Sequence, residues 1–167
     1  MSIRDEMLAE FREELSTTKR ILERIPNDKL AWKPHEKSMS LGQLGLHIAR
    51  VPGAIAGITS KDSFDVLSGN FTTPLPKDTA EIRAALEESV QAVENALTNT
   101  TEDAARAPWH LMRGDQELQA LPRFKAWRTL MLNHWYHHRG QLSVYLRLLG
   151  VPVPVIYGPS ADESPFG

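Results

Sequence analysis

The chain has 167 residues, a formal net charge of −2 at pH 7 and no cysteine. This length predicts one domain, residues 1–167, that is large enough to bury a core of its own. The balanced charge argues against a nucleic-acid partner, and the lack of cysteine excludes disulfides, thiolate metal sites and a cysteine nucleophile.

The first predicted helix spans about residues 3–25. Ser2 stands where an N-cap is expected, and Asp5 and Glu6 follow in the first turn, where acidic side chains complement the helix dipole. Pro26 ends this helix, and residues 26–39 are predicted to be a connection. The apolar residues recur at helical spacing: Ile3, Met7, Phe11, Leu15, Leu22 and Ile25.

The second predicted helix begins at Ser40, which forms a capping box with Gln43. We expect Gly42 and Gly45 to allow a neighbouring helix to approach closely. Pro52 removes a backbone donor, which predicts a kink at that point. The apolar stripe of this helix also holds a histidine: Leu41, Leu44, His47, Ile48, Val51 and Ile55.

Two more helices are predicted after an irregular stretch over residues 60–77. Asp78 caps the third helix and Glu81 lies in its first turn. Its stripe consists of Ile82, Leu86, Val90, Val93 and Leu97. A second long connection, residues 99–122, precedes the fourth helix, which spans about residues 124–149 and ends at Gly150. Its stripe consists of Trp127, Leu130, Met131, Leu142, Tyr145 and Leu149.

Four helices of roughly 20 residues predict an all-α fold, a four-helix bundle with long inter-helix loops and an extended C-terminal tail. The connections over residues 60–77 and 99–123 are longer than helical hairpins need, which is typical of functional lids or of decoration. The tail is rich in proline, yet its first residues are apolar enough to need covering. We therefore expect residues 151–158 to dock as an ordered strap, with the terminal residues looser.

The fourth helix holds a pair of histidines. His134 and His138 lie four residues apart, about 6 Å along the helix axis and on nearly the same face. Imidazoles at this spacing reach one metal ion, and His47 on the second helix completes a three-histidine site. A buried imidazole nitrogen without a partner costs about 1–3 kcal/mol, which favours a shared metal over a chance pair.

Other roles stay open for the histidines. Alone, His47 is better explained as a core residue bonded to a neighbour, and crowded rings that pack without a metal are a further possibility. His137 points about 100° away from His138. It can replace a ligand, but we interpret it as a packing residue or a neighbour of the ligands. His35 and His110 are expected in loops, where His110 can line a pocket mouth. The tryptophans are interpreted as core or loop anchors: Trp32, Trp109, Trp127 and Trp135.

Three neutral imidazoles leave a divalent ion its full charge and open coordination positions. Such an ion is a Lewis acid that lowers the pKa of a bound water or thiol. Imidazole suits zinc, nickel, copper or iron, of which we expect zinc or nickel. The sequence lacks the motifs of helical metalloproteases, di-iron bundles, phosphate-binding loops and serine hydrolases.

Four stretches of the sequence follow the order of one known family. They are residues 30–34 (LAWKP), 40–44 (SLGQL) leading into His47, 133–141 (NHWYHHRGQ) and 157–163 (YGPSADE). On these stretches the chain resembles the DinB-like (DinB/YfiT) superfamily of metal-binding four-helix-bundle proteins. The family pattern implies the metal ligands His47, His134 and His138.

The resemblance also implies a divalent metal, a homodimer and, as in some relatives, an enzyme that uses a low-molecular-weight thiol such as mycothiol or bacillithiol. We therefore expect a metal-dependent, S-transferase-like or hydrolase-like enzyme of unknown substrate, in which Arg139, Gln43 or Arg113 orients the thiol. The alternative is a non-catalytic, stress-associated metal-binding dimer. An open site that faces a cavity lined with polar groups would favour the enzyme, and a closed site would favour the alternative.

The N-terminal residues are too acidic and too weakly apolar for a signal peptide, and no apolar run approaches the length of a membrane span. We therefore expect a cytoplasmic protein that acts on a small molecule, without a membrane partner.

Overall fold

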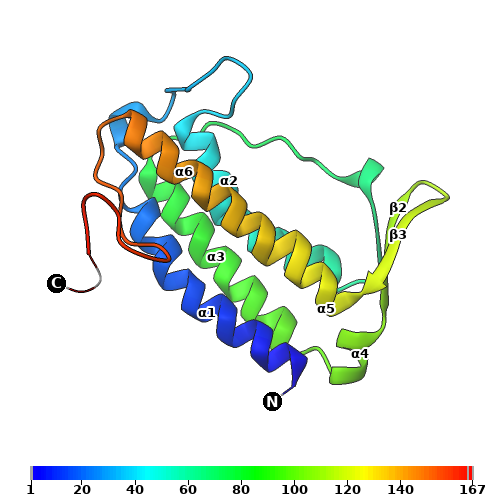
Figure 1. Cartoon of the computed structure of the whole chain (residues 1–167). Helices are drawn as coiled ribbons and strands as arrows, with labels where there is room; N and C mark the ends of the chain where they lie inside the picture. The colour runs from blue at the N-terminus through cyan, green and yellow to red at the C-terminus, as the bar shows by residue number, and fades with distance from the viewer. Residues whose placement is uncertain (1, 165, 167) are drawn as a thin grey trace.

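A computed structural model describes residues 2–164 and 166 of the chain (Figure 1). Four long helical segments lie side by side: α1 (Ile3–Leu22), α2 (Leu41–Thr59), α3 (Thr79–Thr98) and a last segment that ends in α6 (His134–Leu148). Helix α1 packs against α3 and α6, and α2 packs against the same two helices. The bundle predicted from the apolar stripes is therefore present.

The direction of the helices explains the length of one connection. Gly45 of α2 lies against Ile82 near the start of α3, and Gly53 lies against Ser89 further along, so α2 and α3 run in the same direction. Two parallel helices cannot be joined by a short hairpin. Residues 60–78 therefore return along the bundle to the start of α3, as the cyan-to-green trace shows (Figure 1).

The predicted helix starts are confirmed. Ser2 and Ser40 each form a capping box, with Asp5 and Gln43 respectively, and the Asp78 side chain accepts the backbone N–H of Glu81. Two ends differ from prediction. Helix α1 ends at Leu22, three residues before its predicted end at about residue 25. Helix α2 continues through Pro52 to Thr59, beyond its predicted stripe.

The fourth helix is less regular than its apolar pattern predicts. It starts with the short α5 (Arg123–Ala126), passes through seven residues of π-helix, η3 (Trp127–Asn133), and becomes α-helical in α6. A π-helical turn adds a residue without breaking the apolar stripe, so a 3.6-residue period does not reveal it. Such turns are frequent at functional sites, and this one ends directly before His134.

The expectation of an all-α fold is wrong in one respect, because both long connections contain strands. Strands β2 (Pro108–Arg113) and β3 (Gln116–Pro122) form an antiparallel hairpin, and β1 (Ser63–Asp65) pairs with β2 in parallel. The hairpin turns at Gly114, whose φ of +57° is a conformation that glycine adopts without strain. Trp109 of β2 is fully buried, and this anchors the sheet to the bundle. The remaining short elements are η1 (Asn27–Lys29), η2 (Val66–Ser68) and α4 (Glu102–Arg106).

The core lies between the four long segments. Phe11 of α1 stacks on Trp135 of α6 with ring centroids 5.2 Å apart, and Trp127 is also fully buried. Trp32 is partly buried and meets the edge of Tyr145. The interpretation of the tryptophans as core and loop anchors is thus confirmed. Among the described residues, no helix combines the length and the apolar character needed to span a membrane.

The C-terminal tail docks on the bundle as expected. Val153 is buried in the core, and the Val155 carbonyl accepts a hydrogen bond from Arg20. The docked region is longer than predicted, because Asp162 pairs with Arg147 and Glu163 also forms an ion pair with the bundle, with Arg24. Residues 165 and 167 lie outside the described part of the chain.

Candidate metal centre

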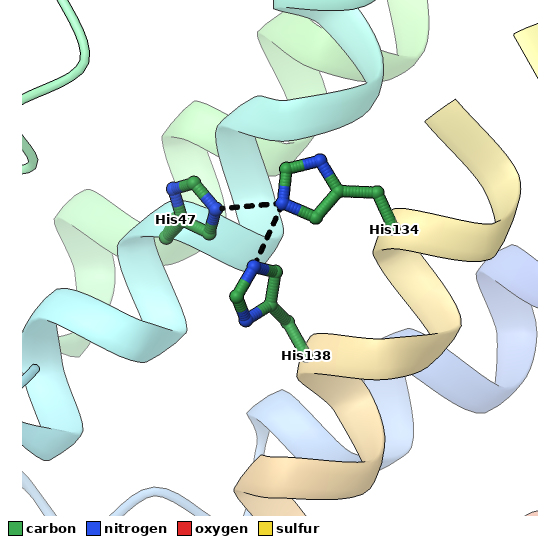
Figure 2. Close-up of side chains that lie close together, drawn as sticks. All are labelled: His47, His134 and His138. Atoms are coloured by element: carbon green, nitrogen blue, oxygen red, sulfur yellow. Dashed lines mark hydrogen bonds between the residues drawn. The ribbon is translucent and has the colours of Figure 1, made fainter. Parts of the chain in front are cut away.

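Three imidazoles converge between α2 and α6 (Figure 2). His47 projects from α2, and His134 and His138 project from successive turns of α6. The Nε2 atom of His134 lies 3.3 Å from Nε2 of His47 and 2.7 Å from Nε2 of His138. The structure thus brings together the three residues that the sequence predicts as ligands.

Neighbouring groups fix the ring nitrogens that face away from the cluster. Gln141 Oε1 lies 2.7 Å from Nδ1 of His138, and because this oxygen is an acceptor, Nδ1 is the protonated nitrogen. The Leu130 carbonyl acts in the same way on His134. The Thr73 hydroxyl lies 3.3 Å from Nδ1 of His47. In neutral His134 and His138, the Nε2 atoms that face the cluster are therefore unprotonated.

Burial keeps the three imidazoles neutral. Desolvation is the main reason that the pKa of His47 falls to about 4, and the positive charges that His138 and His134 would bear lower it further. Desolvation also lowers the pKa values of His134 and His138. Neutral imidazole is the form that binds metals.

The donor set fits a metal ion. The Nε2 atoms of His134 and His138 lie 2.7 Å apart and face each other, so a small outward shift of the rings would let both bind one ion. A tetrahedral ion with nitrogen ligands at about 2.0–2.1 Å holds them roughly 3.3 Å apart, which matches His47 and His134. The candidate ligand atoms of the three residues all lie within 4.8 Å of one another, so together they could hold one ion.

The other histidines lie outside this cluster. His137 is exposed, and its ring meets the edge of the His138 ring with centroids 5.0 Å apart. His35 is exposed in the loop after η1. His110 lies on β2 rather than in a loop, and its Nδ1 atom is 2.6 Å from a carboxylate oxygen of Glu117.

The side chains expected to orient a thiol lie elsewhere. Arg139 is 1% exposed and points to α1, where it pairs with Glu14, so it is a structural residue. Arg113 is exposed at the hairpin turn. Gln43 accepts the backbone N–H of Ser40 and donates to the Thr73 carbonyl, so it holds the loop that contacts His47.

A cavity of about 420 Å³ adjoins the cluster, and both His47 and His134 line it. Its volume lies within the range of small-molecule sites. The walls are mostly apolar, with a few polar groups from the 69–73 loop. The remaining lining residues are Arg50, Val51, Ala54, Ile55, Ile58, Phe64, Gly69, Asn70, Phe71, Thr72 and Thr73.

Two neighbours of the site were not foreseen from the sequence. Gln141 follows His138 by three residues on the same helix face, so helical spacing could have revealed it. Thr73 comes from the long connection before α3, and no local pattern indicates that this loop folds back over α2.

Comparison with known proteins agrees with this architecture. The DinB family model matches residues 1–165. The chain belongs to the DinB family. It is 26% identical over 165 residues, 98% of this chain and 93% of the relative, to the uncharacterized protein YrdA of Bacillus subtilis.

Solved structures share the fold. A DinB-like protein from Bacillus cereus aligns with a TM-score of 0.73 and 23% identity, over 92% of this chain and 97% of its own. A mycothiol-dependent maleylpyruvate isomerase aligns with a TM-score of 0.55 and 15% identity, over 92% of this chain and 67% of its own. At these identities the likeness concerns the fold alone.

Proposed function

We propose that this protein is a metal-dependent enzyme that uses a low-molecular-weight thiol in an S-transferase-like reaction. His47, His134 and His138 would hold one divalent ion, zinc or nickel. The observation that supports this function best is the position of the imidazoles, which converge at a cavity large enough for a small molecule.

The surroundings of the site support this role. When bound, a divalent ion held by three neutral ligands lowers the pKa of a thiol, so that the thiolate forms at neutral pH. Gln141 and Thr73 hold the imidazoles in place, and the apolar cavity walls exclude water from the organic part of a substrate. The chain has no cysteine, so the sulfur must come from a co-substrate.

The comparisons add a separate argument for the thiol. One structural neighbour is a mycothiol-dependent isomerase, and its dependence on a thiol supports a thiol-dependent reaction for this chain. Low-molecular-weight thiols stay reduced in the cytosol, so we also propose a cytoplasmic location.

Metal analysis followed by a thiol assay tests the proposal. Protein purified without an affinity tag is analysed for metals, and then incubated with bacillithiol or mycothiol and 1-chloro-2,4-dinitrobenzene. In the catalysed reaction the thiol proton goes to solvent, a carbon–sulfur bond forms, and chloride leaves with the electron pair of the broken bond. We expect one metal per chain and thiol loss above the background rate, both abolished in His134→Ala.

The same experiment identifies the alternative. A full complement of metal with no thiol consumption, across several electrophiles, would favour a non-catalytic metal-binding protein. The described residues that line the cavity include no aspartate or glutamate that could act as a general base. This observation favours the non-catalytic alternative.

A further inference from the structure

We propose that the cavity beside the histidines binds a small organic acid, with its aliphatic or aromatic body along α2 and its anionic group at Arg50. This inference deepens the proposed function, because it names the chemical class of the second substrate. The binding itself does not depend on a metal and can be tested without one.

One wall of the cavity is a stripe of α2. His47, Val51, Ala54, Ile55 and Ile58 recur at helical spacing and all line the cavity. The twelve residues from His47 to Ile58 span about 16 Å along the helix. The cavity is therefore an elongated groove with the imidazoles at one end and aliphatic side chains at the other.

Another part of the cavity lining is aromatic. Phe64 and Phe71 meet edge to face with ring centroids 6.4 Å apart. Gly69 makes this arrangement possible, because a Cβ atom there would lie 2.6 Å from the Phe71 ring. Phe71 is nevertheless 73% exposed. A ligand with an apolar body would cover this ring and the α2 stripe together, which is a favourable burial.

Charge selects the class of ligand. Arg50 is the only charged side chain among the described residues that line the cavity, and no carboxylate lies among them. Its contact with Glu81 is long, at 3.8 Å, and within the described part of the chain no hydrogen bond involves its guanidinium. The other oxygen of Glu81 already accepts the backbone N–H of Lys77. The Arg50 donors are thus available to a carboxylate, which guanidinium binds well.

Two matched probes test the proposal: 4-phenylbutyrate and its neutral analogue 4-phenylbutanamide, titrated by calorimetry. Chelator-treated protein is used first, so that the carboxylate has no metal to bind, and metal-loaded protein second. The variants are Arg50→Gln, which removes the charge, and Ala54→Trp, which fills the groove from an exposed position. Arg12→Gln and Ala9→Trp, at exposed positions on α1, are the matched controls.

We expect 4-phenylbutyrate to bind metal-free protein about three- to tenfold more tightly than the amide, as one charge-assisted contact provides. Arg50→Gln should remove this difference, and Ala54→Trp should abolish binding of both probes. The two control variants should bind both probes as wild type does. The absence of saturable binding at millimolar concentration, or binding that survives Ala54→Trp, overturns the groove. If wild-type protein binds 4-phenylbutyrate and 4-phenylbutanamide with equal affinity, the role of Arg50 is overturned.

Metal content measured in the same samples separates this inference from the proposed function. Probe binding to a protein that never takes up metal contradicts the metal site but leaves the groove intact. Stoichiometric metal together with no probe binding contradicts the groove alone.

Discussion

At the scale of single residues, the chemistry of the site depends on which nitrogen of each imidazole holds a proton. The acceptors beside His138 and His134 keep Nδ1 protonated, which leaves Nε2 free to bind a metal. His137, one residue from His138, points out to solvent and has no such role. The assignment of ligands can therefore be tested by comparing variants of the neighbouring residues His137 and His138.

The first prediction compares these neighbours. His138→Ala should lower the metal content to background, because two imidazoles alone bind a divalent ion weakly and lose it on dialysis. His137→Ala should keep full stoichiometry. Elemental analysis after dialysis measures both, and full retention of metal by His138→Ala would refute the assignment.

The second prediction concerns Gln141. Gln141→Leu removes the acceptor that orients His138, and the metal affinity should fall about 10- to 100-fold, the usual effect of losing such a partner. Gln141→Glu keeps an acceptor oxygen and should restore most of the affinity. Competition with a chelating dye measures the metal affinity. Gln119→Leu on β3 is the control and should leave this affinity unchanged. Equal affinities for wild type and Gln141→Leu would contradict the role of Gln141.

At the scale of elements, the sequence predicts what local chemistry determines. Helix starts follow from caps such as Ser40, and the juxtaposition of His47 with His134 follows from two apolar stripes that share one core. Strand β1 was missed because it has three residues and gains stability only by pairing with β2, far along the chain. The cavity was missed for a related reason, since its aromatic wall is brought to α2 by a loop with no periodic pattern.

Close approach of α2 and α3 at one glycine gives a third prediction. A Cβ atom on Gly53 would lie 2.7 Å from the backbone Cα of Ser89, so Gly53→Ala should destabilise the fold by about 1–3 kcal/mol. Gly57 lies one turn further on, and a Cβ atom there meets nothing within 4 Å. Gly57→Ala should therefore stabilise the protein by about 0.5–1 kcal/mol. Thermal unfolding measures both, and a Gly53→Ala protein at least as stable as wild type would show that α2 and α3 can separate there without cost.

The docked tail gives a fourth prediction. Deletion of residues 151–167 exposes the core surface that Val153 covers and removes the contacts of Asp162 and Glu163. The melting temperature should fall by several degrees, as expected for a loss of about 1–2 kcal/mol in a protein of this length. An unchanged melting curve at the same oligomeric state would show that the tail adds no stability.

At the scale of the whole molecule, we propose that the protein is a homodimer assembled through helix faces. Among the described residues, only two of the large exposed apolar side chains lie on a long helix. They are Val144 and Leu148 of α6, which are 57% and 61% exposed. Four residues apart, they share one face, and a two-fold axis beside that face would bury both residues of each chain in one interface.

Light scattering at micromolar concentration should then give about twice the mass of the 18.8 kDa chain. Leu148→Glu should give a monomer, because two-fold symmetry places two like charges close together in an apolar contact. Leu118→Glu, an exposed leucine on β3, should leave the dimer intact. A monomer mass for wild type contradicts the dimer. A dimer that survives Leu148→Glu places its interface on another face. If Leu148→Glu gives the expected monomer, the metal content of that monomer shows whether assembly matters for the three-histidine site.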